Sequence, residues 1–469
     1  MSGESAPSGT GGEAGAGLGE SVGSGGVLDF WTISSDRAPP LTAALTHEDG
    51  RAHDQWLSHE ADSNVTGRVN SHQSQPDALP WHVRQDLVRA CLNDDDATLV
   101  SWRLREMYGA GPGSRIYRVT GEASTGAVLT SWSFVIKTFA VEGAGFNVAS
   151  ADASAWDYWK REWLAYQAPW LLALDGSLVA PRRLGAGENH GGGAWVAMED
   201  LSRHDHRPWQ LTRFRSVACC LGLFQAPYLI GRPLPTDPWL SRGWLRGYTD
   251  CSEPMVHQLP TLITHPLVRQ MISDSMAEDL LHLWRERNVV FDALAALPQT
   301  LCHHDLFARN VFVRPTAQGG EQCVAIDWAN CGYGAIGEDL AGLVGTSLIW
   351  FEADGDQAKA LETACLEGYV DGLHAGGWDG DVDDVLLGYL ARTSLANGLG
   401  ALAPAITVAT NEELHAVIEE AFGRAIGNVV TNVGATLAFE QQHIHQLWSL
   451  LTPASVPGRK PVPDPLRWG

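Results

Sequence analysis

Three oxygen-bearing side chains are spaced so that they could meet at one end of a β-hairpin. Asp305 and Asn310 lie in the segment LCHHDLFARNVFV at residues 301–313, and Asp327 follows in VAIDW at residues 324–328. The runs 311–314 and 323–326 are strand-like and are joined by a turn rich in Gly, Pro and Gln. Because the two arms of an antiparallel hairpin start and finish at the same end, we expect Asn310 to lie beside Asp327 and close to Asp305.

Such a set of side chains suits phosphoryl transfer, which needs positioning and neutralisation of charge on the transferred group. Asp305 can accept the proton of an attacking hydroxyl. Asn310 and Asp327 offer the hard oxygen ligands that magnesium prefers. We expect His303, in the same loop, to hold the loop through hydrogen bonds and not to act as a base.

A second group of residues could hold the remaining phosphates of a nucleotide. Lys137 lies in the apolar strand-like run FVIKTF and needs an anionic partner if it is buried. Residues 153–173 are predicted to form an amphipathic helix, and Glu162 lies about 40° from the edge of its apolar stripe. Asp157 lies on the opposite face, so Glu162 is the expected partner of Lys137. The stripe itself consists of aromatic residues at helical spacing: Trp156, Trp159, Trp163, Tyr166 and Trp170.

These candidate residues lie in a chain with the pattern of an α+β protein with two lobes. Strands are predicted near 98–104, 114–121, 127–139, 177–184 and 194–198, and one prominent helix lies among them. Beyond residue 199, helices are predicted at 210–224, 277–296, 338–352, 356–373, 383–396, 411–426 and 428–450. We therefore expect a small β-rich N-lobe at 80–199, which binds the nucleotide, and a larger, mostly helical C-lobe at 200–469. Residues 1–26 are Gly/Ser-rich and predicted to be disordered, and 27–79 form an extension of unclear order.

Composition excludes several classes of protein. The chain has 469 residues, a hydrophobic fraction of 45% and a net charge of −23, which argues against a nucleic-acid binder. It has no apolar run long enough for a membrane helix and no basic leader for secretion, so we expect neither a membrane partner nor export. The eight cysteines include no CxxC pair and are expected to be reduced thiols of a cytoplasmic protein.

The order of these motifs resembles that of the aminoglycoside phosphotransferase and choline kinase-like family. The shared features are a strand Lys, a helix Glu, the pattern HxDxxxxN, an apolar-Asp motif and the element Gly337-Glu338-Asp339-Leu340-Ala341. The resemblance implies a bilobal protein-kinase-like fold that uses ATP and Mg²⁺. It implies that Asp305 is the catalytic base, that Asn310 and Asp327 bind magnesium, and that Lys137 binds phosphate.

The resemblance also assigns parts to less distinctive segments. Met198, Glu199 and Leu201 would belong to the hinge that holds adenine through backbone groups. Asp339 would cap the helix that starts near Leu340. The Gly-rich loop at 108–114, with Gly109, Gly111, Gly113 and then Ser114, is a candidate for covering the phosphates, although its spacing is not G-x-G-x-x-G. His304 stands where the family usually has glycine, so the loop or its substrate contact should differ there.

The acceptor stays open among several classes. An aminoglycoside or another aminated natural product is favoured by the resemblance and by acidity, with Glu412, Glu413, Glu419 and Glu420 as possible pocket residues. A choline- or sugar-type metabolic kinase and a kinase acting on Ser or Thr of a maturing peptide are alternatives. A nucleotide-binding pseudokinase that acts as a partner protein is the non-enzymatic alternative. Zinc at His303 and His304 is disfavoured, as is an EF-hand at 379–390, which is expected to be a capped helix start.

Overall fold

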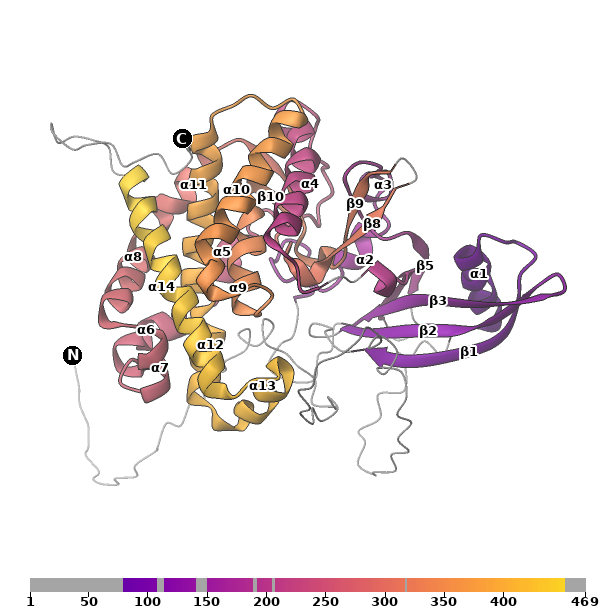
Figure 1. The fold of residues 1–469 in the computed structure, drawn as a ribbon, viewed down its shortest axis with the longest axis horizontal. Coiled ribbons are helices and arrows are strands. Elements are labelled where there is room, and N and C mark those ends of the chain that lie inside the picture. The colour runs from indigo at the N-terminus through magenta and orange to yellow at the C-terminus, as the bar shows by residue number, and fades with distance from the viewer. Residues whose placement is uncertain are drawn as a thin grey trace, which may run out of the picture.

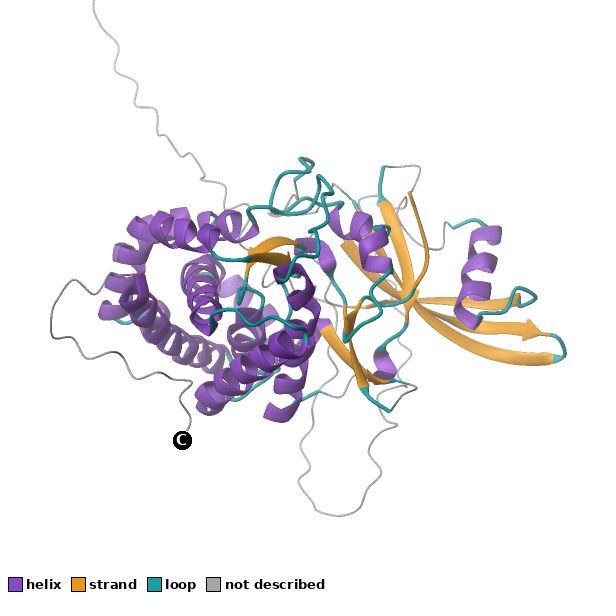
Figure 2. Ribbon diagram, turned by 90° about the horizontal axis from the view of Figure 1, so that it is seen from above, coloured by secondary structure: helices purple, strands orange, loops and turns teal. Residues whose placement is uncertain are grey.

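The computed structural model describes residues 79–107, 114–140, 150–188, 192–204, 207–316 and 319–451. Over these residues a β-rich part and a larger helical part lie side by side (Figure 1). Seen from above, strands gather at one end of the molecule and helices at the other (Figure 2). The predicted two-lobed α+β architecture is thus confirmed. Residues 1–26, most of the extension at 27–79, and the loop with Gly109, Gly111 and Gly113 lie outside the described residues.

A five-stranded antiparallel sheet forms the smaller part. Its spatial order is β1 (Thr98–Met107), β2 (Ser114–Thr125), β3 (Val128–Phe139), β6 (Ala194–Glu199) and β5 (Arg183–Glu188). On β3, Trp132, Phe134 and Ile136 alternate onto one face, where they pack with α1 (Trp81–Leu92) in a common core. Lys137 follows Ile136 and therefore lies on the opposite face, toward the helical part.

The predicted helix over 153–173 is wrong as a continuous element. The structure has two short helices, α2 (Arg161–Ala165) and α3 (Pro169–Leu172), and residues 150–160 form turns with a single bridge between Ser150 and Tyr158. A residue before proline avoids the helical region, and Ala168 adopts φ −70° and ψ 130°. The aromatic residues therefore do not form one buried stripe. Trp156 and Trp159 instead line a cavity between the two parts.

The larger part is mostly helical. Its helices are α4 (Leu211–Leu229), α5 (Trp244–Asp250), α6 (Glu253–Leu262), α7 (Pro266–Met271), α8 (Asp274–Ala296), α9 (Ser347–Ile349), α10 (Ala358–Ala375), α11 (Val382–Arg392), α12 (Leu402–Thr410), α13 (His415–Phe422) and α14 (Ile426–Leu451). Two π-helical segments span Gly342–Thr346 and Thr393–Gly400. The long helices agree with those predicted from the sequence. The short helices α5, α6, α7 and α12 were not predicted, and the last three of them contain proline.

Two small sheets carry the motif residues. One has the order β4 (Leu178–Val179), β9 (Glu321–Ala325) and β8 (Val311–Pro315), and the other pairs β10 (Gly332–Ala335) with β7 (Gln299–Cys302). The β8/β9 pair is the predicted antiparallel hairpin, with Val311 opposite Ala325. No described helix is both long and apolar enough to cross a membrane.

Candidate active site

The loop between β7 and β8 carries Asp305 and Asn310. A single 3₁₀ turn at Ala308–Asn310 ends the loop and brings the two residues together. The amide nitrogen of Asn310 donates to the backbone carbonyl of Asp305 and to its carboxylate, each at 2.9 Å. This leaves the amide oxygen of Asn310 as a possible metal ligand, and it fixes the orientation of the Asp305 carboxylate.

Asp327 lies next to this pair because of the hairpin register. The backbone N–H of Ile326 donates to the carbonyl of Asn310 at 2.9 Å, which brings the residue after Ile326 to the mouth of the loop. Asp327 itself has φ 62°, in the left-handed region that non-glycine residues rarely adopt. The predicted proximity of Asp305, Asn310 and Asp327 is therefore found, and the three supply the hard oxygen donors that suit magnesium.

His303 forms hydrogen bonds with backbone groups at Asp305 and next to Asp327, and both of its ring nitrogens are used. Its Nδ1 accepts the backbone N–H of Asp305 at 3.2 Å, so its Nε2 carries the proton that is donated to the carbonyl of Ile326 at 2.9 Å. Burial lowers the pKa of His303 to about 4, so the ring is neutral at physiological pH. The ring packs against Trp328 with centroids 4.6 Å apart. These contacts agree with the positioning role expected for His303.

Lys137 forms buried ion pairs with both parts of the molecule. Its ammonium nitrogen lies 2.6 Å from Glu162 Oε2 and 3.1 Å from Asp327 Oδ1. Burial opposes the charged form, but the Asp327 and Glu162 carboxylates outweigh it and raise the pKa of Lys137 above its usual value. The predicted Lys137–Glu162 pair is thus present, and the additional contact with Asp327 was not anticipated.

Glu162 is positioned by its neighbour Arg161, which sequence analysis overlooked. The buried guanidinium donates to the carbonyls of Trp239 at 2.8 Å, Trp156 at 2.7 Å and Ala329 at 3.1 Å, and also to that of Ala155. These bonds hold α2 against the segment that follows Asp327. The only sign in the sequence that Arg161 holds α2 in place is an arginine within a short apolar segment, and that pattern is common.

The pKa of the Asp305 carboxyl is raised well above its usual value. Burial raises the pKa of Asp305 to about 8, and the charge of Asp327 adds to the increase, while Arg392 and the bond from Asn310 oppose it. A carboxylate that is costly to keep charged is a better proton acceptor than a solvated one.

Asp339 does not cap a helix, contrary to the prediction. Its two carboxylate oxygens accept the backbone N–H groups of His303 and His304, each at 2.6 Å. The carboxylate thereby holds the loop from a position 36 residues further along the chain. His304 has φ 65°, a conformation that glycine adopts at lower cost, and its ring stacks on Trp244 with centroids 5.3 Å apart.

The proposed hinge residues lie apart from Asp305. Met198 is buried in the sheet opposite Val135, and Leu201 is buried in a small core with Val324. The backbone N–H of Glu199 donates to the carbonyl of Arg182 at 3.0 Å, and its side chain forms an ion pair with Arg314 at 2.9 Å. The amide of Glu199 is therefore occupied within the sheet, so adenine contacts would have to come from neighbouring backbone groups.

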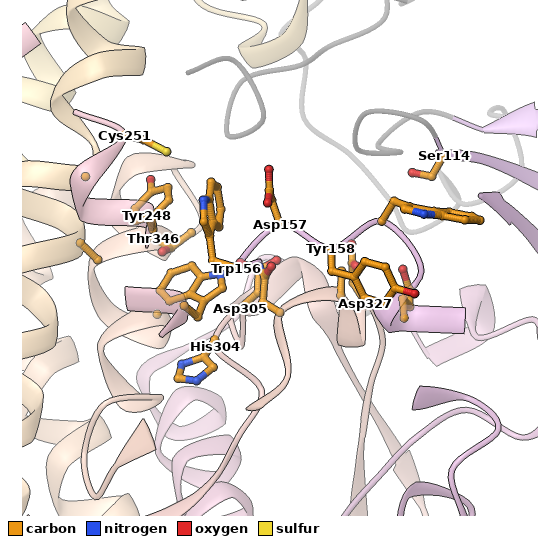
Figure 3. A pocket seen from close by; sticks show the side chains of 18 of the residues that line it. Ser114, Trp156, Asp157, Tyr158, Tyr248, Cys251, His304, Asp305, Asp327 and Thr346 are labelled. Atoms are coloured by element: carbon orange, nitrogen blue, oxygen red, sulfur yellow. The ribbon is translucent and has the colours of Figure 1, made fainter. Parts of the chain in front are cut away.

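A cavity of about 220 Å³ lies between the two parts and contains the remaining candidates. Figure 3 shows Asp305 near its middle, with Asp327, Tyr158 and Ser114 on one side and Tyr248, Thr346 and Cys251 on the other. Ser114, the first residue of β2, thus lines the same cavity as Lys137 and Asp327.

Several lining residues had no signal in the sequence. Trp244 and Tyr248 come from α5, an unpredicted helix, and Arg392 comes from the end of α11. In contrast, Glu412, Glu413, Glu419 and Glu420 are not among the residues that line this cavity.

The structure also shows the residues of the two metal sites that the sequence disfavours, which are zinc at His303 and His304 and an EF-hand at 379–390. The rings of His303 and His304 diverge, since their Nε2 atoms bond the carbonyls of Ile326 and Tyr333 respectively. Asp381 is the N-cap of α11, where its side chain accepts the backbone N–H of Asp383 at 2.9 Å. The acidic run at 379–384 is therefore a capped helix start, as predicted.

Comparisons with known proteins agree with this geometry. Residues 152–380 match the model of the phosphotransferase enzyme family, a range that includes Glu162, Asp305, Asn310 and Asp327. No curated protein sequence matches the chain.

Among solved structures, an aminoglycoside phosphotransferase from Alicyclobacillus acidocaldarius is similar, with 15% identity, a TM-score of 0.45, and coverage of 81% of this chain and 100% of that one. An amicoumacin kinase in complex with AMP-PNP and Ca²⁺ has 13% identity, a TM-score of 0.43, and coverage of 76% and 92%. An aminoglycoside phosphotransferase, APH(3'')-Id, from Streptomyces rimosus has 18% identity, a TM-score of 0.36, and coverage of 67% and 97%.

Proposed function

We propose that this protein transfers the γ-phosphate of ATP to a hydroxyl group of a small molecule, and the match of residues 152–380 to the model of the phosphotransferase enzyme family supports this. The observation that carries the proposal is the meeting of Lys137 with Asp327, 3.1 Å apart, beside the bonded pair Asp305 and Asn310. The Lys137 ammonium group, the Asn310 amide and the carboxylates of Asp305 and Asp327 thus lie together, and phosphoryl transfer requires such a set of groups.

In the proposed reaction Asp305 acts as the general base. Its carboxylate takes the proton of the acceptor hydroxyl as the acceptor oxygen forms a bond to the γ-phosphorus. The bond between the γ-phosphorus and the oxygen bridging to the β-phosphorus breaks, and ADP leaves. His303 and Asn310 hold Asp305 in place, and the raised pKa of Asp305 suits it to receive a proton.

Binding of the nucleotide would involve both parts of the protein. Lys137, oriented by Glu162, would contact phosphate oxygens, and Ser114 at the cavity rim could donate to them. Asn310 and Asp327 would hold magnesium, which when bound neutralises charge on the phosphates. Adenine would lie toward Met198 and Leu201, with the occupied amide of Glu199 excluded as a contact.

The test is magnesium-dependent transfer of phosphate to a panel of acceptors. Aminoglycosides, choline, amino sugars, aromatic alcohols and hydroxyl-bearing peptides would be incubated with ATP, followed by mass spectrometry of each acceptor and measurement of ADP. The proposal predicts a mass gain of one phosphate on a small molecule only when magnesium is present. A gain restricted to peptides would favour the peptide kinase, and binding of ATP without transfer to any acceptor would favour the pseudokinase.

A further inference from the structure

The half of the cavity beyond Asp305 has a distinct chemical character. It is lined by aromatic residues from two segments, by small residues from the two π-helical segments and α12, and by few charged groups. This is where an acceptor must lie if Asp305 is to reach its hydroxyl, because Asp327, which pairs with Lys137, lies on the other side of Asp305 (Figure 3).

Three aromatic side chains form a continuous surface there, which we call the aromatic wall: Trp156, Tyr248 and Trp244. Trp244 stacks on Tyr248 with centroids 5.1 Å apart. Trp156 lies next to Tyr248 (Figure 3) and meets it edge-on, with centroids 6.0 Å apart. Trp244 is buried, whereas Trp156 and Tyr248 are half-buried and present ring surface to the cavity. The wall ends at His304, which precedes Asp305 in the chain and stacks on Trp244 with ring centroids 5.3 Å apart.

Two glycines make room for the aromatic wall. A Cβ at Gly247 would lie 2.3 Å from Cδ1 of Trp156, and a Cβ at Gly400 would lie 2.4 Å from Cε1 of Tyr248. Any other residue at either position would displace a ring. The backbone at Gly247 therefore packs closely against Trp156 and that at Gly400 against Tyr248, which lowers the cost of ordering the rings around a ligand.

The charges in this half of the cavity do not suit a polycation. Arg392 is buried and lines the cavity. It makes no salt bridge with any carboxylate of the described chain. Its Nη2 donates to the carbonyl of His304 at 3.1 Å, and its Nε has no hydrogen-bond partner among the described residues. Its guanidinium lies 4.1 Å from the ring of Trp244. Apart from Glu162, Asp305 and Asp327, the only acidic residue lining the cavity in the described chain is Asp157.

We propose that the acceptor is an uncharged, flat, unsaturated molecule whose ring stacks on Trp156 and meets Tyr248 edge-on, and whose hydroxyl reaches Asp305. The inference rests on the proposed phosphotransferase function and specifies the substrate class of the same site. Stacking supplies affinity without charge. Arg392 disfavours a cationic acceptor, and the carboxylates of Asp157, Asp305 and Asp327, which line the same cavity, disfavour an anionic one.

Calorimetric titration in the presence of Mg²⁺ and AMP-PNP tests the proposal with matched probes. These are naphthalenemethanol, its saturated counterpart decalinmethanol, the naphthalene alcohol carrying a quaternary ammonium or a carboxylate group, and kanamycin. The neutral aromatic alcohol should bind about tenfold more tightly than each of the other probes. Trp156→Ala should weaken its binding by about tenfold or more while the affinity for AMP-PNP is kept, and Trp156→Phe should recover part of the loss.

Trp209 provides the matched control, since it is half-buried, packs on Phe214 and does not line the cavity. Trp209→Ala should leave the affinity for the alcohol unchanged. Tighter binding of kanamycin or of either charged alcohol, or no binding of the neutral alcohol to protein that binds AMP-PNP normally, would overturn the inference and leave the phosphotransferase function standing. Failure to bind AMP-PNP with Mg²⁺ would instead count against the proposed function itself.

Discussion

Lys137 and Asp327 are separated by 190 residues in sequence, yet the ammonium nitrogen of one lies 3.1 Å from a carboxylate oxygen of the other. Lys137 comes from the central strand of the N-terminal sheet, and Asp327 follows the second strand of the hairpin in the helical part. With Glu162 at 2.6 Å from the same nitrogen, the lysine joins the two parts at the floor of the cavity. The phosphates of a nucleotide bound there would compete with Asp327 for the ammonium group of Lys137.

Replacing Lys137 should therefore impair nucleotide use specifically. Lys137→Met is expected to lower turnover by about two to three orders of magnitude and to raise the KM for ATP, because a fixed positive charge on the phosphates is lost. Steady-state kinetics at varied ATP would measure both. Lys160→Met is the control, since Lys160 pairs with Glu188 outside the cavity. Equal effects of the two substitutions would argue against a phosphate-binding role for Lys137.

The neutral ring of His303 should position Asp305 without exchanging protons. His303→Ala is expected to lower kcat by about two orders of magnitude through misplacement of Asp305, and to leave the shape of the pH–rate profile unchanged, because the pKa of His303 is about 4. Kinetics from pH 6 to 9 provide the measurement, with exposed His445→Ala as the control. Loss of an ionisation near neutral pH in the variant would instead indicate a base.

A buried ion cluster away from the cavity should make stability depend on pH. The two ring nitrogens of His443 lie 2.6 Å from Glu362 and 2.7 Å from Glu440. Burial opposes the charged ring, but Glu440 and Glu362 outweigh it and raise the pKa of His443 to about 9. Since the unfolded pKa is about 6.5, the contribution to stability is complete below pH 6.5 and is lost as pH rises through 9.

Urea unfolding at pH 6.5 and 9.5 would measure this effect. The wild type should lose up to about 3 kcal/mol of unfolding free energy from His443 between these values. In His443→Gln that part of the pH dependence should disappear, and stability at pH 6.5 should fall by about 3–5 kcal/mol, because buried Glu440 loses its cation and Glu362 keeps only the exposed Lys359. His445→Gln should keep the wild-type slope. An unchanged slope in His443→Gln would show that the ring is not charged in the folded protein.

The contact between α4 and α10 should tolerate no side chain at its glycines. A Cβ on Gly372 would lie 2.2 Å from the carbonyl oxygen of Cys219, and one on Gly222 would lie 2.2 Å from that of Tyr369. Gly372→Ala should destabilise the protein by about 1–3 kcal/mol, measured by urea unfolding. Gly427→Ala meets nothing within 4 Å and should be neutral or slightly stabilising. A neutral Gly372→Ala would mean that the helices can separate at little cost.

Local rules of chain geometry explain which parts of the site could be predicted. The proximity of Asn310 and Asp327 follows from the two arms of one hairpin, and the pairing of Glu162 with Lys137 needed only the buried face of a short helix. Both are relationships between neighbouring elements. The order of the lobes followed from the change from strand-like to helical patterns near residue 199.

Relationships between distant segments could not be read from the sequence. The carboxylate of Asp339 reaches back to the N–H groups of His303 and His304, while a local rule predicted a helix cap. Trp156 was assigned to a helical stripe because aromatic spacing suggested one, although Pro169 signalled a break further along. Arg392 and Tyr248 meet the cavity only through tertiary packing of helices whose ends carry no motif.

The most direct test of the central claim compares the wild type with Asp305→Asn. Asparagine keeps the shape of the side chain but cannot accept the proton of the acceptor hydroxyl. Transfer of labelled γ-phosphate to an acceptor should fall by about two to four orders of magnitude, while calorimetry shows an affinity for MgATP close to that of the wild type. Near-normal transfer by Asp305→Asn would contradict the assignment of Asp305 as the base.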